Sequence, residues 1–500
     1  MSHVTRFSAL LLASVLLPAC GGGGGGGDGT QTRFTPSDSE IAASWHLKNT
    51  GQGGGTAGED CRAEGAWQAL RTGQGIRVCV IDDGVELTHE DLAPNVVAGA
   101  SLNLNGGTDP APAGAADNHG TAVAGVTCAR GGNGTGGTGV APFASLVGVA
   151  PIPAGNTQAT TAMTHNVAVT DVYNMSYGPN DDGNVYSLSA AYDAAVVQGL
   201  TNGRGGKGTV YIRAAGNGGA APVVDYANLD EENGHYGVIA VGAVGADGKM
   251  SDYQELGCCT LICGPTSSAG LPGILTTDRT GAAGYDPTNY TNTFGGTSSA
   301  APLVSGVVAL MLHANPSLTW RDVRRILTLT ARKNDPTDAG WATNGAGRAI
   351  NHKYGYGSVD ATAAVQMAVG FNSLGTNLPL VTSPTDTPAA AIPDNDATGI
   401  TRTITVTNSG RTRVDHVVVV ADITHPAFRQ LDITLTSPAG TVSRLAVPGV
   451  GGGASPGVNQ LATVLLLNEA VDGTWTLRVK DLAAGSTGSL ASWFLRIYAD

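Results

Sequence analysis

Three short segments supply an acid, a base and a hydroxyl in a fixed order along the chain. Asp82 follows the apolar run 76–81, His119 opens the sequence His-Gly-Thr, and Ser298 lies in Gly-Gly-Thr-Ser-Ser-Ala-Ala-Pro at 295–302. A serine hydroxyl is a poor nucleophile until a base removes its proton, and the base needs a third group that fixes its tautomer. These residue types predict an acyl-transfer site of the serine endopeptidase kind.

A fourth segment, Ala-Ala-Gly-Asn-Gly-Gly at 214–219, presents Asn217 on a glycine-flanked turn. An amide N–H at such a place can donate to the oxyanion that forms during acyl transfer. Each segment alone is a weak signal, since His-Gly-Thr or an Asn between glycines is more often structural. Four segments in a consistent order, each at the end of a predicted strand or helix, make coincidence a poor explanation.

Short apolar runs alternate with helical patterns from about residue 45 to 368, which indicates a doubly wound α/β domain with a parallel sheet. The predicted elements are strands at 76–81, 167–175, 210–215 and 238–244, and helices at 121–129, 300–313 and 319–331. Asp82 is thereby placed at the carboxyl end of a strand, where such sheets carry their sites. Ser298 is placed at a helix N-terminus, and Pro302 is expected in the first turn of that helix, where proline is tolerated.

The pattern changes near residue 370. Beyond Gly399 apolar and polar residues alternate, as in Trp475–Lys480, and turn residues separate the alternating segments. A period of two indicates an antiparallel β-sandwich. We therefore expect a peptidase domain at 44–370, a linker rich in Pro, Thr, Asn and Asp at 371–397, and a sandwich domain at 398–500.

The overall composition is that of a globular, loop-rich chain with an acidic surface. The formal net charge is −13, from 40 acidic and 27 basic residues, and 73 of the 500 residues are glycine. This charge disfavours nucleic acid or an anionic membrane surface as the main partner and is compatible with cationic substrates. Acidity that serves solubility alone is the alternative.

The first residues are typical of an export signal. His3 and Arg6 precede a short apolar run, and Leu-Pro-Ala-Cys at 17–20 resembles a bacterial lipobox in which Cys20 would be acylated. We expect a signal peptide at 1–20 and a glycine-rich tether at 21–43, and hence an exported protein, either an envelope lipoprotein or extracellular. Ordinary signal cleavage, with Cys20 incidental, stays open.

Six further cysteines follow the signal segment, an even number that in an exported chain suggests disulfides. Their pairing stays open, because six cysteines permit 15 connectivities. Cys79 and Cys128 lie in apolar segments and could instead be small core residues. No Cys-x-x-Cys pair has zinc-ligand spacing, so no zinc site is expected. The six are Cys61, Cys79, Cys128, Cys258, Cys259 and Cys263.

Residues 44–368 resemble the subtilase superfamily, in particular its kexin/furin-like branch. The family motifs match at Asp82, His119, Ser298 and the oxyanion residue Asn217. The C-terminal region resembles the proprotein-convertase P domain, a jelly-roll sandwich. The segments that carry the branch and P-domain resemblance are Asp82–Gly84, Met175–Gly183, Gly203–Gly206, Ile392–Asp396, Asp422–His425, Leu435–Thr441 and Gly473–Leu477.

The resemblance implies cleavage after basic residues of protein or peptide substrates. By position, Asp83 would face the penultimate substrate residue, while Asp181 and Asp225 would line the primary pocket, since a desolvated substrate cation needs a paired carboxylate. The apolar stretch 220–224 departs from the family pattern, and Asn180 replaces a common acid. These aspartates could instead cap turns or bind metal, which would leave a subtilase of broad preference.

The resemblance also implies Ca²⁺ as the cofactor, because the matching segments offer several oxygen ligands. Asp91 matches a family ligand, and Asp181 with Glu255 could hold a second ion. A solvated acidic surface is the alternative for both places. The remaining residues assigned to calcium are Asp60 and four residues of the loop 130–137, namely Arg130, Asn133, Thr135 and Gly137.

Maturation is expected to differ from that of many subtilases. Only 28–43 separates the glycine run from the first matching segment, Ser44–Gly51, which leaves no room for a usual propeptide. A folding chaperone, or help from the sandwich domain, is therefore expected. We also expect a monomer that contacts membrane only through its lipid anchor. An inactive surface-binding lipoprotein that retains the fold is the alternative from another functional class.

Overall fold

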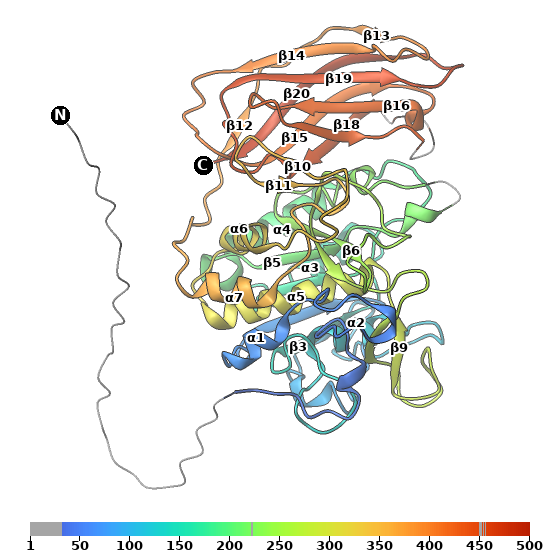
Figure 1. Ribbon diagram of the computed structural model, residues 1–500, viewed down its shortest axis with the longest axis vertical. Coiled ribbons are helices and arrows are strands. Elements are labelled where there is room, and N and C mark those ends of the chain that lie inside the picture. The colour runs from blue at the N-terminus through green and yellow to red at the C-terminus, as the bar shows by residue number, and fades with distance from the viewer. Residues whose placement is uncertain (1–32, 222–223, 450–452, 454, 456) are drawn as a thin grey trace, which may run out of the picture. The chain divides into compact units, whose positions relative to one another are not determined.

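The computed structural model describes residues 33–221, 224–449, 453, 455 and 457–500. The predicted signal peptide, the acylated Cys20 and most of the tether fall on residues 1–32 and lie outside the described residues. The remainder forms an α/β domain followed by an all-β domain (Figure 1). The predicted fold class is therefore confirmed.

A seven-stranded parallel sheet forms the centre of the α/β domain, in the order β2-β3-β1-β4-β5-β6-β7. Its strands are nearly continuous apolar runs because helices cover both faces. In β1 the side chains of Val78, Cys79, Val80 and Ile81 are fully buried. The strands are β1 Arg77–Ile81, β2 Leu102–Asn103, β3 Ser145–Ala150, β4 Val172–Met175, β5 Val210–Ala214, β6 Val238–Val244 and β7 Thr260–Pro265.

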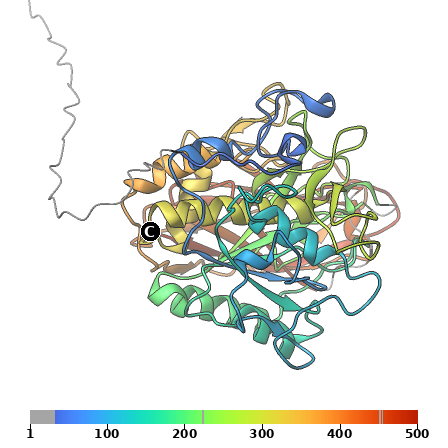
Figure 2. The ribbon, with the colours of Figure 1, turned by 90° about the horizontal axis from the view of Figure 1, so that it is seen from below.

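Two groups of helices sandwich this sheet (Figure 2). Helices α2 and α7 pack against α5 on one face, and α3 packs against α4 on the other. Helix α6 begins with a capping box, in which Thr319 and Asp322 exchange side-chain-to-backbone hydrogen bonds. The helices are α1 Ala63–Gln68, α2 His119–Cys128, α3 Asn156–Met163, α4 Ala190–Asn202, α5 Thr297–Ala314, α6 Trp320–Thr330 and α7 Ala361–Val369.

Helix α5 begins three residues before the predicted start, at Thr297. Pro302 therefore lies beyond the first turn, contrary to our expectation. Proline has no N–H to donate to the carbonyl four residues earlier, which is that of Ser298. The Ser176 hydroxyl donates to this carbonyl instead, at 3.0 Å. The irregular start of α5 is thus joined to the segment that follows β4.

Short antiparallel pairs complete the α/β domain. The pair β8 Ile274–Thr277 and β9 Tyr290–Phe294 lies beside α2, and the pair β10 Ala342–Thr343 and β11 Ala349–Ile350 follows α6. The hydroxyls of Thr276 and Thr277 donate to carbonyls of α2. The end of β8 is thereby fixed near the start of α2.

The second domain consists of two antiparallel sheets, as the alternating pattern predicted. One sheet has the order β12-β20-β15-β18 with β13 also paired to β20, and the other has the order β14-β19-β16-β17. In β19 the alternating residues Trp475, Leu477 and Val479 are fully buried. The strands are β12 Leu380–Thr382, β13 Ala390–Ile392, β14 Ile400–Val406, β15 Val414–Thr424, β16 Leu431–Thr436, β17 Val442–Ala446, β18 Gly457–Thr463, β19 Gly473–Asp481 and β20 Gly488–Ala499.

The segment 371–397, which we expected to be a linker only, contributes to the sandwich. It contains β12 and β13, and both strands pair with β20. Because these strands are three residues long and separated by turn residues, the alternation that marks the longer strands is absent from the sequence here. The sandwich thus begins earlier than residue 398.

The expected disulfides are not formed among the cysteines that the structure describes. All six side chains are buried free thiols. Each lies in tightly packed surroundings: the Cys258 sulfur, for example, donates to the carbonyl of Ala462. Burial raises the pKa of the Cys258 thiol to about 11. These cysteines therefore act as small core residues, the alternative that was open for Cys79 and Cys128.

Candidate active site

The carboxylate of Asp82 and the imidazole of His119 form a hydrogen-bonded pair at the carboxyl end of the sheet, in which Asp82 is buried and the His119 side chain is 27% exposed. Asp82 directly follows β1, and His119 is the first residue of α2. His119 Nδ1 lies 2.8 Å from Asp82 Oδ1. The close approach requires glycine at position 120, because a Cβ there would lie 2.4 Å from the Gly84 carbonyl oxygen. The His-Gly sequence thus permits the contact that Asp82 makes with His119.

The surroundings of His119 favour its protonated form. Burial on its own would lower the pKa of His119, but the Asp82 carboxylate, through its charge and its hydrogen bond, raises it above the usual value. The ring of Phe294 meets the imidazole edge to face, with the centroids 5.5 Å apart. Asp82 is fully buried, and its Oδ2 atom has no hydrogen-bond partner in the described part of the chain.

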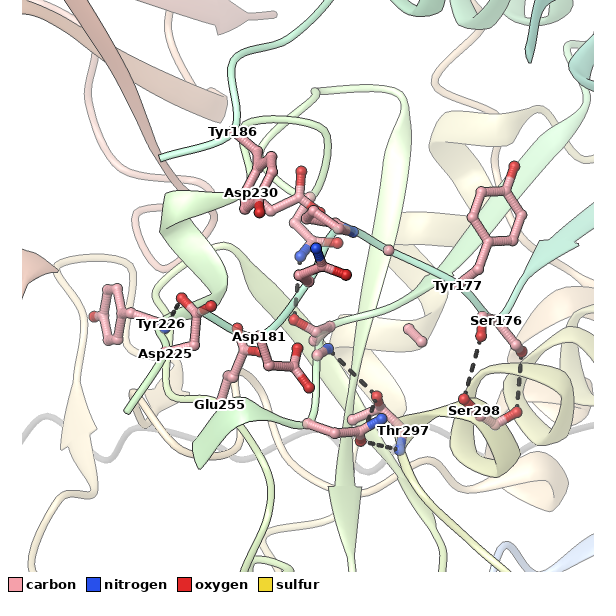
Figure 3. Close-up of a pocket in the computed structure, with 18 of the residues that line it drawn as sticks. Ser176, Tyr177, Asp181, Tyr186, Asp225, Tyr226, Asp230, Glu255, Thr297 and Ser298 are labelled. Atoms are coloured by element: carbon pink, nitrogen blue, oxygen red, sulfur yellow. Dashed lines mark hydrogen bonds between the residues drawn. The ribbon is translucent and has the colours of Figure 1, made fainter. Parts of the chain in front are cut away.

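Ser298 lies in the first turn of α5 and is joined to Ser176 by two hydrogen bonds (Figure 3). Its hydroxyl donates to the Ser176 carbonyl at 3.2 Å, while its own carbonyl accepts from the Ser176 hydroxyl at 3.0 Å. Within the described residues the Ser298 hydroxyl forms no hydrogen bond with His119. The serine is therefore near the start of α5 as predicted, with its oxygen bound elsewhere in this state.

Asn217 follows β5 and presents its amide group beside the start of α5. Its Oδ1 accepts from the backbone N–H of Thr297 at 2.8 Å and from the Thr297 hydroxyl at 2.9 Å. Because the oxygen is held by these two donors, the NH₂ group points away from Thr297 and stays available as a donor. Asn217 and Ser298 line the same cavity, the arrangement that an oxyanion donor requires.

This cavity has a volume of about 130 Å³ and an acidic end (Figure 3). Carboxylate oxygens of Asp181, Asp225 and Glu255 all lie within 4.8 Å of one another. Asp181 is exposed, whereas Asp225 and Glu255 are buried. Burial and, after it, the charge of Asp225 raise the pKa of Glu255 to about 9. The structure thus brings together three acids that lie far apart in the sequence.

Backbone N–H groups hold two of these carboxylates in place. Asp225 accepts from Gly183 at 3.0 Å and from Tyr226 at 2.7 Å, and Glu255 accepts from Gly218 at 3.0 Å. Burial raises the pKa of Asp225 as well. Three like charges at this spacing repel one another unless a cation or a proton neutralises them. The donor set fits a divalent cation or the cationic side chain of a substrate.

A fourth acid at this cavity escaped the sequence analysis. Asp230 lines the cavity and is paired at 2.7 Å with Arg213, a fully buried residue of β5 that also pairs with Glu232. A charged residue inside the apolar strand 210–215 was the available signal, because a buried guanidinium needs carboxylate partners.

Asp83 has a different environment from the other acids assigned to substrate binding. Its two oxygens accept from the first N–H groups of α2, those of His119 at 3.1 Å and Gly120 at 2.8 Å. Burial and the neighbouring Asp82 charge raise its pKa to about 6. A carboxylate at a helix N-terminus is favourable, so Asp83 helps to position the catalytic-site histidine whatever it contacts in a substrate.

The loop assigned to calcium surrounds Asp91. Asn133 Nδ2 donates to Asp91 Oδ1 at 2.6 Å, while the buried Asp91 Oδ2 has no partner within the described ranges. Burial raises the pKa of Asp91 to about 6. Asp38, which the sequence analysis missed, accepts from the backbone N–H groups of Gly132 and Asn133. An orphaned carboxylate oxygen beside a second acid fits a hard cation.

Asp60 is held elsewhere. Its oxygens accept from the backbone N–H groups of Asn49 at 2.6 Å and Arg62 at 2.8 Å. Asp38, rather than the predicted Asp60, is the acid that binds the loop around Asp91, through the backbone N–H groups of Gly132 and Asn133. Both acids precede an apolar pattern near the N-terminal end of the α/β domain, so spacing alone did not distinguish them.

The other residues assigned to the calcium loop follow the chain around Asp91. Arg130 donates its backbone N–H to the Asp91 carbonyl, and its guanidinium bonds Asn95 and lies over the Phe143 ring. Thr135 donates its backbone N–H to Asn133 Oδ1 at 2.9 Å. Gly137 is buried at the end of this loop. The oxygen atoms that these three residues offer to a cation are their backbone carbonyls and the Thr135 hydroxyl.

Comparison with known proteins finds a family match for each of the two domains. Residues 73–357 match the subtilase family of peptidases, and residues 414–497 match the proprotein convertase P-domain. Among solved structures, the serine protease of Aeromonas sobria superposes with a TM-score of 0.84 at 27% identity, over 95% of this chain and 97% of that one. The same protease has also been solved in complex with a chaperone.

Characterised relatives include convertases from animals and yeast. A PC3-like endoprotease of Hydra vulgaris is 34% identical over 89% of this chain and 64% of the relative. Human proprotein convertase subtilisin/kexin type 7 is 33% identical over 92% and 60%, and kexin of Saccharomyces cerevisiae is 30% identical over 94% and 57%. This chain thus spans less than two thirds of the length of these relatives.

The family match covers more than half of the 500 residues, and the parallel seven-stranded sheet agrees with it. The P-domain match falls on the sandwich. The chain belongs to the subtilase family, in its kexin-like group whose peptidase domain is followed by a proprotein convertase P domain.

Proposed function

We propose that the chain is a serine endopeptidase that hydrolyses peptide bonds after basic residues. The observation that carries this proposal is the shared cavity, which has Ser298 and the Asn217 amide at one end and three carboxylates at the other. A substrate whose cationic side chain reached the acids would expose its next carbonyl carbon to the serine. The convertase and kexin relatives support the same reading.

The proposed chemistry gives a distinct role to each of the four residues Asp82, His119, Ser298 and Asn217. The Ser298 hydroxyl leaves the Ser176 carbonyl, gives its proton to His119 Nε2 and attacks the carbonyl carbon. Asp82, bound to His119 Nδ1, fixes the tautomer and stabilises the imidazolium. The oxyanion accepts hydrogen bonds from the Asn217 amide and from a backbone N–H group at the start of α5. His119 then returns the proton to the leaving amine, and water hydrolyses the acyl-enzyme by the same route.

The acidic cluster supports a preference for Arg or Lys at the residue before the cleaved bond. Asp181, Asp225 and Glu255 would share the substrate cation, and a buried charge of this kind is stable only when paired. Asp83 is proposed to favour a second basic residue beside it, since its carboxylate lies next to His119. Asp230 contributes less, because Arg213 already neutralises it.

The decisive experiment compares Arg-Arg and Ala-Ala-Phe peptides of equal length. We expect kcat/KM to favour the basic peptide by at least about 100-fold, because only that peptide forms a desolvated ion pair with the carboxylates. Asp225→Asn should remove most of that preference, whereas Asp182→Asn, a neighbouring acid outside the cluster, should keep it. Equal rates for both peptides would indicate a subtilase of broad preference.

A fluorophosphonate label separates the enzyme from a catalytically silent binder. Only a serine activated by its base reacts with such a label. We expect labelling of the intact chain and none in Ser298→Ala. An unlabelled but folded chain would support the alternative of a surface-binding lipoprotein.

Calcium is proposed as the structural cofactor at two places. Asp38, Asp91, Asn133 and loop carbonyls would hold one ion, and Asp181, Asp225 and Glu255 would hold another when no substrate cation occupies the cluster. Bound calcium would neutralise carboxylates that otherwise repel one another. We expect saturating EGTA to lower the melting temperature and added Ca²⁺ to restore it. Unchanged melting and activity in EGTA would exclude the calcium proposal.

Export, anchoring and assisted folding are proposed from the sequence. Acylation of Cys20 would place the enzyme at the bacterial envelope, and radiolabelled palmitate would be incorporated by the chain but not by Cys20→Ala. The chaperone complex of the Aeromonas sobria protease supports a folding partner for this chain. Full activity after expression alone in a heterologous host would argue against such a partner. The active unit is proposed to be a monomer.

A further inference from the structure

A small cavity lies between the two domains, distinct from the active site. Helix α6 of the peptidase domain lines one side through Trp320, Arg324 and Arg325, and β15 of the sandwich lines the other through Asp415 and His416. The cavity has a volume of about 10 Å³. One small species fits a space of that size.

Three polar side chains on this cavity lack partners within the described residues. They are the indole N–H of Trp320, Nη1 of Arg324 and Nδ1 of His416. Their exposed fractions are only 3%, 9% and 1%. Buried polar groups of native proteins are seldom left unpaired, so three on one cavity indicate a missing ligand. Trp320 and Arg324 are four residues apart and therefore share one face of α6.

The charges around the cavity leave a cation without a counter-ion. Arg321 pairs with Asp415 and Asp500, and Arg325 pairs with the other oxygen of Asp415. Arg324 has no ion pair among the described residues, although it is buried beside two other guanidinium groups. An arginine stays protonated in such a place. The excess positive charge favours an anion over water as the occupant.

We propose that this cavity between the domains is a halide site. One chloride ion would accept hydrogen bonds from the N–H groups of Trp320, Arg324 and the protonated ring of His416. A monatomic anion suits the small volume and the three unpaired donors, since both oxygens of the nearby Asp415 carboxylate are already paired with Arg321 and Arg325. Carboxylate or phosphate ligands are too large for a space of this size. The ion would join α6 to β15 and so strengthen the contact between the peptidase and P domains.

Chloride binding is coupled to proton uptake at His416. Its Nε2 lies 2.8 Å from the Gly234 carbonyl, so this nitrogen carries the hydrogen, and Nδ1 of the neutral ring is bare. Burial and the Arg324 charge lower the pKa of His416 well below its usual value. The groups that face the ring are Arg324 and the other α6 arginines, Asp415 on its own strand, His235 and the Tyr498 ring.

An anion at Nδ1 offsets the repulsion from Arg324, so the protonated ring and the anion stabilise each other. If one proton is taken up with each chloride, the apparent Kd should fall about tenfold for each pH unit of acidification. The site would therefore fill as the surroundings become acidic.

The test is a chloride titration of the calcium-loaded full chain, followed by thermal unfolding. Sodium chloride replaces sodium gluconate at constant ionic strength, at pH 6 and at pH 5. We expect a saturable rise of about 1–3 °C in Tm, with a midpoint tenfold lower at pH 5. No chloride dependence, or a midpoint independent of pH, would overturn the proposal.

Variants locate the effect. Arg324→Met should abolish it, and His416→Gln, which keeps an N–H toward the Gly234 carbonyl but lacks Nδ1, should remove its pH dependence. Lys48→Gln deletes a surface cation paired with Glu64 and should respond as the parent chain does. Crystals grown in bromide at pH 5 should show anomalous scattering beside Trp320 Nε1, whereas density without anomalous signal would identify water and refute the halide.

Discussion

At the scale of single residues, Asn217 has two separable tasks. Its oxygen fixes the start of α5 through Thr297, and its NH₂ group is proposed to stabilise the oxyanion. Asn217→Ala should lower kcat by about 10²–10³ with little change in KM, because an oxyanion donor acts only in the transition state. Steady-state kinetics with an Arg-Arg peptide would measure this.

A matched variant distinguishes the two tasks. Thr297→Val removes one of the donors to Asn217 Oδ1 and keeps the backbone N–H, so the amide should stay in place and kcat should fall less than tenfold. A loss in Thr297→Val as large as that in Asn217→Ala would assign the effect to the start of α5 rather than to the oxyanion.

The raised pKa of His119 predicts how kcat/KM depends on pH. Burial opposes protonation of His119, but Asp82 prevails and raises the pKa above the usual 6.5. A general base must be unprotonated, so kcat/KM should decline as the pH falls through the raised pKa, with an inflection above 6.5. Asp82→Asn should lower kcat by about 10⁴ and move the inflection to lower pH. Profiles measured in excess calcium that inflect below 6.5 in the parent would contradict this account.

At the scale of elements, the first turn of α5 is stabilised by a side-chain hydrogen bond in place of the usual backbone one. Pro302 cannot donate to the Ser298 carbonyl, and the Ser176 hydroxyl does so at 3.0 Å. Ser176→Ala should lower the free energy of unfolding by about 1–3 kcal/mol, since it leaves a buried carbonyl unpaired. Urea unfolding with calcium present would measure the loss.

The double variant Ser176→Ala/Pro302→Ala restores an N–H four residues after Ser298. It should recover part of the loss, so that the two substitutions are not additive. Additive losses would show that the Ser298 carbonyl does not need a partner from either source.

The same elements show what a sequence can reveal about this site. Asp82, His119, Ser298 and Asn217 were identifiable because each lies at the end of a strand or helix with its own local signature. The start of α5 was predicted too late because proline is usual in the first turn of a helix. Nothing in the sequence shows that the hydroxyl of Ser176, after β4, donates to the carbonyl that Pro302 leaves without an N–H donor.

Other residues were missed because only tertiary packing brings them together. Asp38 and Asp91 both bind Asn133, and Asp230 is held at the active-site cavity by its pairing with Arg213. Short strands such as β12 carry no alternation of their own and exist because β20 offers them a partner. Buried cysteines resemble paired ones in a sequence, since both are apolar and exported chains often contain disulfides.

At the scale of the whole molecule, the P domain supports one wall of the active-site cavity. The hydroxyl of Tyr226, the residue after Asp225, donates to the Arg444 carbonyl at 2.7 Å. The Asn228 amide donates to the Ala462 carbonyl at 2.6 Å, and its oxygen accepts from the Cys259 backbone N–H. The sandwich therefore holds the segment that carries an acid of the proposed specificity pocket.

A pair of asparagines separates this support from general stabilisation. Asn228→Ala should raise KM for an Arg-Arg peptide several-fold and lower Tm, because the segment that carries Asp225 loses its anchor. Asn344 also spans the domains, through the carbonyls of Leu465 and Leu467, but it lies in the turn between β10 and β11, a segment from which no residue lines the active-site cavity. Asn344→Ala should therefore lower Tm to a similar extent and leave KM unchanged. If both variants raised KM equally, the P domain would act on the peptidase domain as a whole, and the specific link from β17 and β18 to Asp225 would be refuted.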